Sequence, residues 1–443
     1  MTSAGYRGAS VMSPTADGSL LALETALGLT PTGPVERPHF FTGLLARPDV
    51  AAAGLLAVAD VAASRYFDAG LMRRLANLDP VVTASGDRLR FESFSACNGV
   101  HARLDLLGDG IASGEVGFGT TNVDVNQPLR TALASVGREA LVHLSVGADE
   151  LRVSTPEASH EERKVAMPDR WVRGFAEVPV LASGLAHAAS LTGSAVVRFL
   201  AGLPKRQPGP SLYLVPGPAG LRQSARPVPG AVHLAGAGRL AAAARIARFA
   251  TSLDAFSSDS GASGWVLHLP GARLTLLLSP EPHRGFSGEG GLLRALSADA
   301  AEGAAAQLLE FLAWEPVVDP IALAELTGLP PEGVHAGLAV LATSGKVGFD
   351  VVEQSWFHRE LPLAERVERD NPRLVAARRL VSDGAVGRDG DRWVVTVDDH
   401  QHWVRGVGEA ASCTCLWHAK HRGGRGPCKH VLAVAITAAD PVG

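Results

Sequence analysis

The chain has 443 residues, and at about 150 residues per domain it is long enough for roughly three domains with separate cores. Hydrophobic residues make up 46% and charged residues 19%, a composition that excludes a disordered chain. The 41 basic and 45 acidic residues give a formal net charge of −4, so the chain as a whole lacks the positive field of a general nucleic-acid coat protein.

We expect neither a membrane span nor a secretory signal. No run of 18 consecutive apolar residues is free of charge. The first apolar run, 20–29, is interrupted by Glu24 and lacks a basic leader and a cleavage site, which favours a cytoplasmic protein. Three of the four cysteines fall within 16 residues near the C-terminus, and in a reducing compartment this clustering predicts a metal site.

The N-terminal part of the chain predicts an α+β fold. Residues 1–35 are rich in Ser, Thr, Gly and Pro and are expected to form a flexible tail. The domain 36–203 is expected to mix strands and helices without a regular βαβ order. Its first helix is expected to begin at Pro48, with Asp49 as N-cap, and to continue to Leu78. Further strands are expected at 88–95, 102–108, 115–119, 141–147 and 150–155, and further helices at 128–136 and 187–200.

A second α+β domain is predicted for residues 212–297. The Pro- and Gly-containing segment 204–211 is the clearest linker in the chain and separates this region from the first domain. A helix is expected at 239–253, and 265–269 and 272–278 are expected to pair as a hairpin.

Residues 298–362 resemble a winged helix-turn-helix module. Three helices, at 299–314, 319–329 and 331–345, precede two short strands. The third helix of such a module reads DNA, but 331–345 contains no Lys or Arg. We therefore expect this winged-helix-like module to pack against other parts of the chain or to dock a partner.

The C-terminal domain, 363–443, contains the motif that carries chemistry. A hairpin is predicted at 385–397, with an Asp-Gly turn, and another strand follows. The pattern C-x-C-x12-C-x-H is then formed by Cys413, Cys415, Cys428 and His430. Zinc takes four sulfur or nitrogen ligands at tetrahedral corners, commonly as two close pairs.

The two candidate ligand pairs need different backbones. Residues two apart on a strand point to the same face, so Cys413 and Cys415 can contact one ion from a strand. Residues two apart on a helix point about 200° apart, so Cys428 is expected just before a helix and His430 in its first turn.

The motif and its preceding hairpin resemble the SWIM zinc finger, a β-hairpin followed by a helix. The resemblance covers only the C-terminal end of the chain and assigns as zinc ligands Cys413, Cys415, Cys428 and His430. Four protein ligands leave no open coordination position, which implies one structural zinc ion. His418 and His421 lie between the two pairs and remain alternatives to His430.

The resemblance also suggests a function. SWIM fingers are credited with contacts to DNA or to protein, which implies a zinc-binding interaction or adaptor protein. Bacterial proteins with such a C-terminal finger resemble a group often encoded beside MoxR-type ATPases and von Willebrand A proteins, and these are the candidate protein partners.

The segment between the ligand pairs predicts a docking surface. No acidic residue lies within 413–430, and Trp417 supplies an aromatic anchor. The basic residues there are Lys420, Arg422, Arg425 and Lys429. We expect an acidic partner, with protein slightly favoured over nucleic acid. The alternative is a DNA-binding regulator that uses the winged helix and the finger together.

No motif of a known catalytic class occurs, so we do not expect an enzyme. The polar segment 117–133, in which Asp124 and Arg130 are able to line a small site, leaves a cryptic enzyme in the N-terminal region as a second alternative.

Overall fold

The computed structural model describes most of the chain. The residues left out are 1–4, 7, 32, 37, 67–78, 148–162, 165–166, 205–208, 219, 287–298, 362–371, 398–399, 408–409, 422–426 and 440–443. The described elements mix helices and strands without βαβ alternation, which confirms the predicted α+β class. Among the described residues, no helix is both long enough and apolar enough to cross a bilayer.

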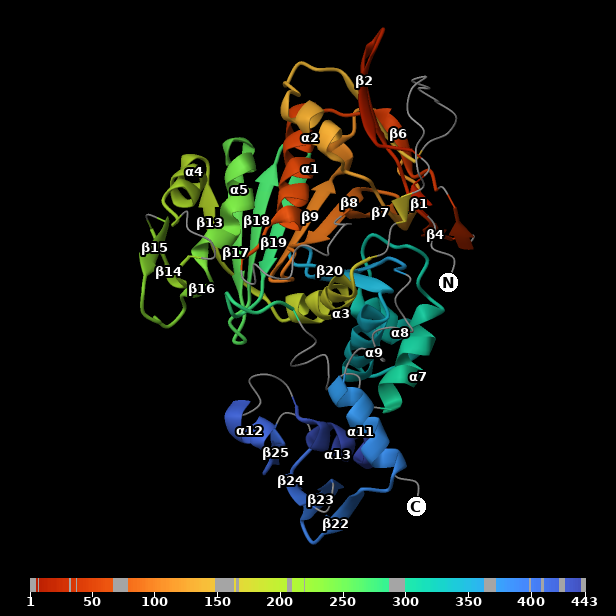
Figure 1. The fold of residues 1–443 in the computed structure, drawn as a ribbon, viewed down its shortest axis with the longest axis vertical. Helices are drawn as coiled ribbons and strands as arrows, with labels where there is room; N and C mark the ends of the chain where they lie inside the picture. The colour runs from red at the N-terminus through yellow and green to blue at the C-terminus, as the bar shows by residue number, and fades with distance from the viewer. Residues whose placement is uncertain are drawn as a thin grey trace.

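A ten-stranded antiparallel sheet forms the centre of the fold (Figure 1). In spatial order its strands are β13 (Ala186–Thr192), β17 (Ser252–Ser257), β18 (Ser263–Leu269), β19 (Ala272–Leu278), β9 (Val100–Leu106), β8 (Leu89–Phe94), β7 (Val81–Ser85), β10 (Phe118–Asn122), β4 (Gly28–Thr30) and β5 (Gly33–Val35). The predicted hairpin is β18–β19, and β19 pairs with β9, with Leu274 opposite Leu104. This pairing corrects the expected division into domains 36–203 and 212–297, because both regions share one sheet and one core.

Helices cover one face of this sheet. They are α1 (Pro48–Ala63), α2 (Gln127–Ala134), α4 (Ser194–Ala201) and α5 (Ala241–Ile246). α1 is rich in Ala, Leu and Val on all sides and is almost wholly buried. A Cβ atom on Gly54 would lie 2.5 Å from the Leu104 side chain, so this glycine allows α1 to approach β9 closely.

α1 differs from its prediction at both ends. Asp49 lies inside the first turn and is not the N-cap; it pairs with Arg47, the N-cap residue, at 2.9 Å. The helix ends at Ala63 because Ser64 is extended. The remainder of the predicted helix, 67–78, lies outside the described residues.

Two other predicted helices are shorter than expected. Residues 187–192 belong to β13, and α4 begins only after Gly193, which has a φ of +50°. Pairing of β13 with β17 overrides the helix propensity of its alanines. In the predicted helix 239–253, 3-10 turns flank α5, and β17 already begins at Ser252.

The N-terminal residues are part of the fold and not a flexible tail. Leu21 and Leu23 are buried in the main core, and hydrophobic burial outweighs the turn-forming composition of this segment. A four-stranded sheet consists of β2 (Val11–Thr15), β3 (Gly18–Leu23), β11 (Val142–Val146) and β6 (Phe41–Leu44). Two smaller sheets consist of β15 (Gly220–Ser224), β14 (Leu212–Gly217) and β16 (Val232–Leu234), and of β1 (Gly5–Tyr6) and β12 (Arg163–Lys164).

The second face of the large sheet is covered by α3 (Asp169–Ser183) and by the module 299–361. The module consists of α7 (Asp299–Leu309), α8 (Pro320–Thr327), α9 (Pro331–Thr343), β20 (Val347–Asp350) and β21 (Ser355–His358). Three helices and an antiparallel hairpin thus follow the predicted order, while the winged-helix assignment itself stays a prediction.

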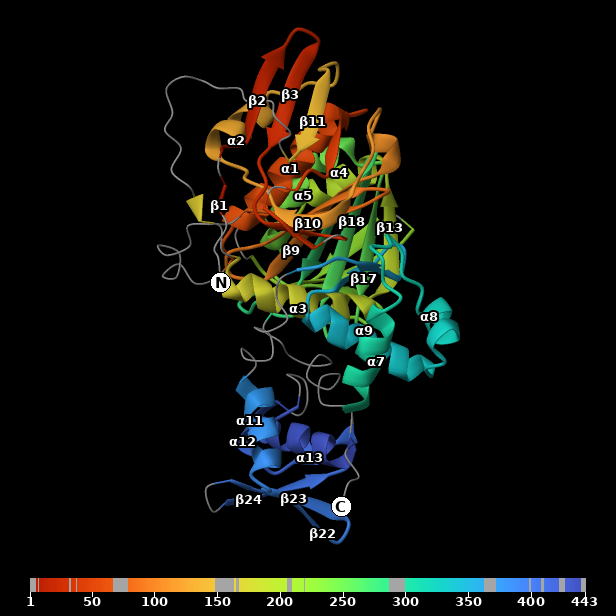
Figure 2. The same cartoon turned by 90° about the vertical axis from the view of Figure 1, so that its right-hand side faces the viewer.

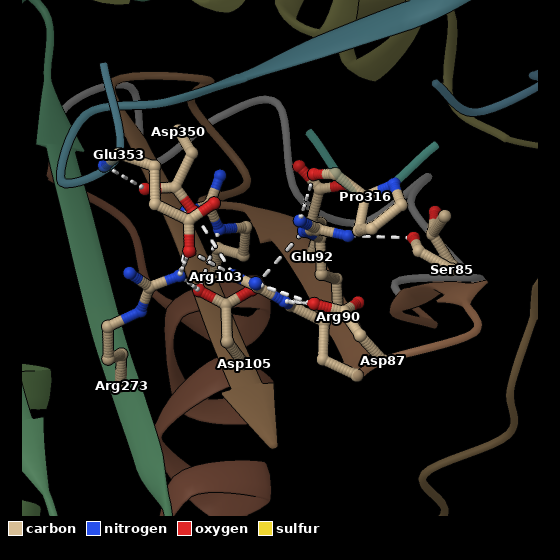
Figure 3. A network of polar contacts seen from close by, with 12 residues as sticks. Ser85, Asp87, Arg90, Glu92, Arg103, Asp105, Arg273, Pro316, Asp350 and Glu353 are labelled. Carbon is tan, nitrogen blue, oxygen red and sulfur yellow. Dashed lines mark hydrogen bonds and ion pairs between the residues drawn. The ribbon is translucent and has the colours of Figure 1, made fainter. Parts of the chain in front are cut away.

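Charged side chains on this second face of the sheet are buried under the β20–β21 hairpin (Figure 3). Asp350, at the end of β20, accepts hydrogen bonds from Arg103 at 2.8 Å and from Arg273 at 2.7 Å. Arg359 donates to Glu92 at 2.7 Å. Burial alone raises the pKa of Asp350, but the neighbouring guanidinium groups of Arg103 and Arg273 outweigh it and hold this pKa well below its usual range.

The C-terminal elements lie at the opposite end of the molecule from β2 and β3 (Figure 2). They are α11 (Pro372–Ser382), β22 (Val386–Asp389), β23 (Arg392–Val397), β24 (His400–Arg405), β25 (Ser412–Cys413), α12 (Leu416–His421) and α13 (Lys429–Ala439). The four strands form one antiparallel sheet in this order. Gly390, with a φ of +61°, lies in the predicted turn of the first hairpin.

We predict that Asp350→Ala lowers the free energy of unfolding by about 3–5 kcal/mol. Without Asp350, Asp105 is left as the one fully buried carboxylate beside the buried guanidinium groups of Arg90, Arg103 and Arg273. Glu302→Ala removes the exposed pair with Arg378 and is the control, with an expected cost below about 1 kcal/mol. Urea unfolding of the whole chain measures both. Equal small losses in the two variants would show that the buried pair is not stabilising.

Acidification should destabilise the same interface. Asp350 and Glu92 both have folded pKa values below their unfolded values, Glu92 because the Arg359 charge outweighs the effect of burial. Their stabilisation is therefore complete at neutral pH and is lost progressively below about pH 5. Urea unfolding at pH 7, 5 and 3.5 should show this decline, and it should be smaller in Asp350→Ala. An identical decline in both proteins would contradict the assignment to Asp350.

Candidate metal centre

The first ligand pair comes from the end of a strand. Cys413 is the last residue of β25 and lies opposite Val404 of β24. Thr414 continues the pairing, since its N–H donates to the Trp403 carbonyl at 3.1 Å. Cys413 and Cys415 are buried while Thr414 between them is exposed, which is the alternation that the sequence predicts.

The second pair comes from the start of α13. Cys428 immediately precedes the helix, and its carbonyl accepts the first helical hydrogen bond, from Leu432. The Val431 N–H donates to the Cys428 sulfur at 3.5 Å, so the sulfur occupies the place of an N-cap side chain. His430 lies in the first turn. Both placements confirm the prediction from spacing.

The two pairs meet in one buried group. The ligand atoms of Cys413, Cys415, Cys428 and His430 all lie within 4.8 Å of one another. The Cys413 sulfur lies 3.7 Å from the Nδ1 atom of His430. Zinc–sulfur and zinc–nitrogen bonds of about 2.3 and 2.0 Å put tetrahedral ligand atoms about 3.5–3.8 Å apart, so these positions fit one zinc ion.

The chemistry of the donors also fits zinc. The hydrogen bond between the two thiols raises the pKa of Cys413 and lowers the pKa of Cys415, because one sulfur then carries the negative charge and the other keeps its proton. A divalent cation provides the positive charge that lets all three sulfurs ionise together. Three thiolates and one imidazole are a common donor set of structural zinc sites, and four protein ligands close the coordination shell.

A small apolar shell supports the ligands. Val395 and Val404 of the sheet pack with Val431 and Val434 of α13 and with the three cysteines. The ring of His402 stacks on His430, with centroids 4.0 Å apart, and restrains its orientation. Partial burial, followed by the nearby His430, lowers the pKa of the His402 imidazole, which favours its neutral form.

Of the two alternative ligands, His418 is not part of the group. The backbone N–H of His418 donates to the Cys415 sulfur at 3.5 Å, but its ring is not among the four grouped donors. The side chain of His421 lies outside the described residues. Among the described side chains, His430 is the fourth member of the group.

The predicted docking residues are described only in part. Trp417 is half-buried, and the guanidinium of Arg373 on α11 lies 4.4 Å above the centre of its ring. Lys429 is half-buried at the start of α13. Arg422, Arg425 and the side chain of Lys420 fall outside the described residues, so their role stays a prediction.

Sequence analysis missed the most exposed apolar side chain near the metal. Leu416 follows Cys415 directly, begins α12 and is 88% exposed. Leu416 is not part of a periodic apolar pattern. The one signal for it in the sequence is its position directly after a metal ligand. The outward direction of Trp403 and Arg405 was predictable from the sequence. They flank Val404 on a strand, and since Val404 faces the core, its two neighbours face the other side of the sheet.

The candidates for a cryptic enzyme do not converge. Arg130 pairs with Asp60 on α1, which also pairs with Arg245 at 2.7 Å. Asp124 instead accepts hydrogen bonds from the Ser10 N–H and the Asn126 amide. These partners give both residues a role in the packing between elements. Asp60 and Arg245 also line a cavity of about 580 Å³, whereas Asp124 is not part of its lining.

One further polar group lies on the large sheet. Ser190 of β13 donates to Asp254 of β17 at 2.5 Å, and His187 and His268 lie beside them. In a hydrolytic triad the serine donates to a histidine that the carboxylate orients. Here the Asp254 carboxylate accepts the hydrogen bond from Ser190 directly, and the Nε2 atom of His187 lies 2.9 Å from the same hydroxyl, so the order of contacts differs from that of a triad.

We predict one zinc ion per chain in protein purified without chelators. Cys428→Ala should lose the ion and unfold the finger while the ten-stranded sheet stays folded, because metal binding supplies on the order of 10 kcal/mol to such a site. Elemental analysis and amide hydrogen exchange measure the two effects. His418→Ala is the control and should keep its zinc. Zinc retained by Cys428→Ala, or lost by His418→Ala, would overturn the ligand assignment.

Comparison with known proteins gives one family match. The family model of the SWIM zinc finger matches residues 393–439, which contain the hairpin, all four ligands and α13. No curated protein matches the chain. Among solved structures, proliferating cellular nuclear antigen from Entamoeba histolytica is similar at 10% identity over 55% of this chain and 100% of that chain, with a TM-score of 0.34. A likeness at that level establishes neither a common fold nor a shared function. Residues 393–439 are thus a SWIM zinc finger, with four Cys and His ligands positioned to hold one zinc ion.

Proposed function

We propose that this protein is a non-enzymatic adaptor whose SWIM finger docks a partner protein. SWIM fingers mediate contacts with protein or nucleic acid, and the closed ligand set gives the zinc ion a structural role. The observation that carries the choice of a protein partner is Leu416, 88% exposed at the edge of the zinc site.

Leu416 has the properties of an interface anchor. Zinc fixes the neighbouring Cys415, so the backbone that presents Leu416 is held rigid before any partner binds. A leucine side chain gains about 1.5–3 kcal/mol from burial, which a protein cavity supplies and a phosphate backbone does not. The basic segment that follows, with Lys420, Arg422 and Arg425, favours an acidic rim around that cavity.

A nucleic-acid partner is the second candidate, on a different face of the finger. The outer face of the sheet carries Arg392, Trp403 and Arg405, with the Arg392 guanidinium 6.0 Å from the Trp403 ring. A base stacks well on such an aromatic side chain, and flanking arginines contact phosphate.

A regulator that also reads DNA through α9 is less favoured, because residues 331–345 contain no Lys or Arg.

The MoxR-type ATPases and von Willebrand A proteins that the resemblance suggests are the partners to look for first. An acidic surface with an apolar cavity on one of them would match Leu416 and the basic segment.

We predict that Leu416→Asp reduces capture of the partner from native lysate about tenfold or more without loss of zinc. Val407→Asp is the matched control: Val407 is 49% exposed in the same finger, but it lies in the connection between β24 and β25 and not next to a metal ligand. Nuclease treatment of the lysate should leave capture unchanged. Capture that survives Leu416→Asp but disappears with nuclease or in Trp403→Ala would replace the protein partner by nucleic acid.

A further inference from the structure

A second candidate surface lies on the module 299–361, and its charge is opposite to that of the finger. From 299 to 345 the chain has no Lys or Arg. The same stretch contains seven acidic residues, which are Asp299, Glu302, Glu310, Glu315, Asp319, Glu325 and Glu332. Glu310, Glu325 and Glu332 are exposed, and no described Lys or Arg forms an ion pair with them. The module therefore presents a negative field on its surface.

Helix α8 exposes large apolar side chains within this acidic region. Ile321 is 70% exposed and Leu326 is 62% exposed, while Val317, just before the helix, is 46% exposed. Ile321 and Leu326 lie roughly 7–8 Å apart along the helix axis and about 140° apart around it, so they flank a broad face that also contains the exposed Glu325. We call Val317, Ile321, Glu325 and Leu326 the α8 surface.

The fold does not need these side chains for its own core. α8 is anchored by Leu323, which is buried with residues of α7 and α9. Asp319 caps the helix by accepting the Ile321 N–H at 2.8 Å, and Gly328 ends it with a φ of +70°. Exposed apolar side chains that lie together on one element and are flanked by charged residues are typical of a contact site.

We propose that the α8 surface docks a basic amphipathic helix of a partner protein. The apolar face of such a helix covers Ile321 and Leu326. Its Lys or Arg side chains reach Glu325 and also Glu332, which lies in the first turn of α9, the helix that packs against α8. Charge excludes the competing occupants: a phosphate backbone is repelled by the carboxylates, and a second copy of this module brings the same negative charge. This surface is separate from the finger, so it adds a contact and does not depend on the function proposed above.

The test uses the full chain and a defined probe. The probe is an 18-residue Leu/Lys peptide with leucines at helical spacing, and its binding is followed by fluorescence anisotropy at physiological salt. We expect micromolar binding that weakens at least tenfold in Ile321→Asp/Leu326→Asp. We also expect Glu325→Gln/Glu332→Gln to bind more weakly and to depend less on salt. Val375→Asp, at a 47% exposed valine on α11, is the matched control and should bind as the wild type does.

Four results would overturn the proposal. The first is equal binding of a scrambled peptide of the same composition, which would show charge attraction alone. The second is equal binding of a Leu/Glu peptide, which would remove the charge argument. The third is peptide binding that survives Ile321→Asp/Leu326→Asp in a variant whose circular dichroism is native. The fourth is a wild-type dimer that the double variant dissociates, which would make the occupant a second copy.

Discussion

The fold depends on a group of charges buried on one face of the large sheet, where Asp105 of β9 and Asp350 of the β20–β21 hairpin together neutralise the arginines. Strands β8, β9 and β19 place Arg90, Arg103 and Arg273 on that face, and Asp350 of the hairpin reaches two of them. Without the hairpin these guanidinium groups belong in water. The module 299–361 is therefore bound to the sheet by the requirement to pair its charges, and it cannot move away as a unit without exposing or stranding them.

This constraint explains what sequence analysis was able to predict. Alternation of apolar and charged residues located β8 and β9 correctly, because period two is a local property. The same alternation predicts that the charged face of β8 and β9 is exposed to water. In the structure this face is buried, because its arginines pair with Asp350, far away in the chain. The strand β13 was missed for a related reason, since its partner β17 lies far away in the chain. The strands of residues 11–35 form the local hairpins β2–β3 and β4–β5, and they were missed because their Ser, Thr, Gly and Pro content indicates a tail.

The metal centre was predictable because all its chemistry is local. Its ligands lie within 18 residues, and each backbone requirement follows from their spacing. The surfaces around the metal centre were not predictable, because the exposure of a side chain depends on which other parts of the chain pack over it. Trp417 looks like a free anchor in the sequence, yet Arg373 from α11 lies over its ring, whereas the neighbouring Leu416 stays exposed.

The core of the finger is so small that the finger can contact a partner only while its cysteines are reduced and bound to zinc. Apart from the ligands, few side chains are fully buried there, chiefly Val395, Val404 and Val434. So small a core does not hold the strands and α13 together once the sulfurs are oxidised or the metal is withdrawn. The large sheet has no such dependence. Oxidation of the cysteines or loss of zinc would therefore unfold the finger and abolish its contacts, while the separate core of the large sheet stays folded.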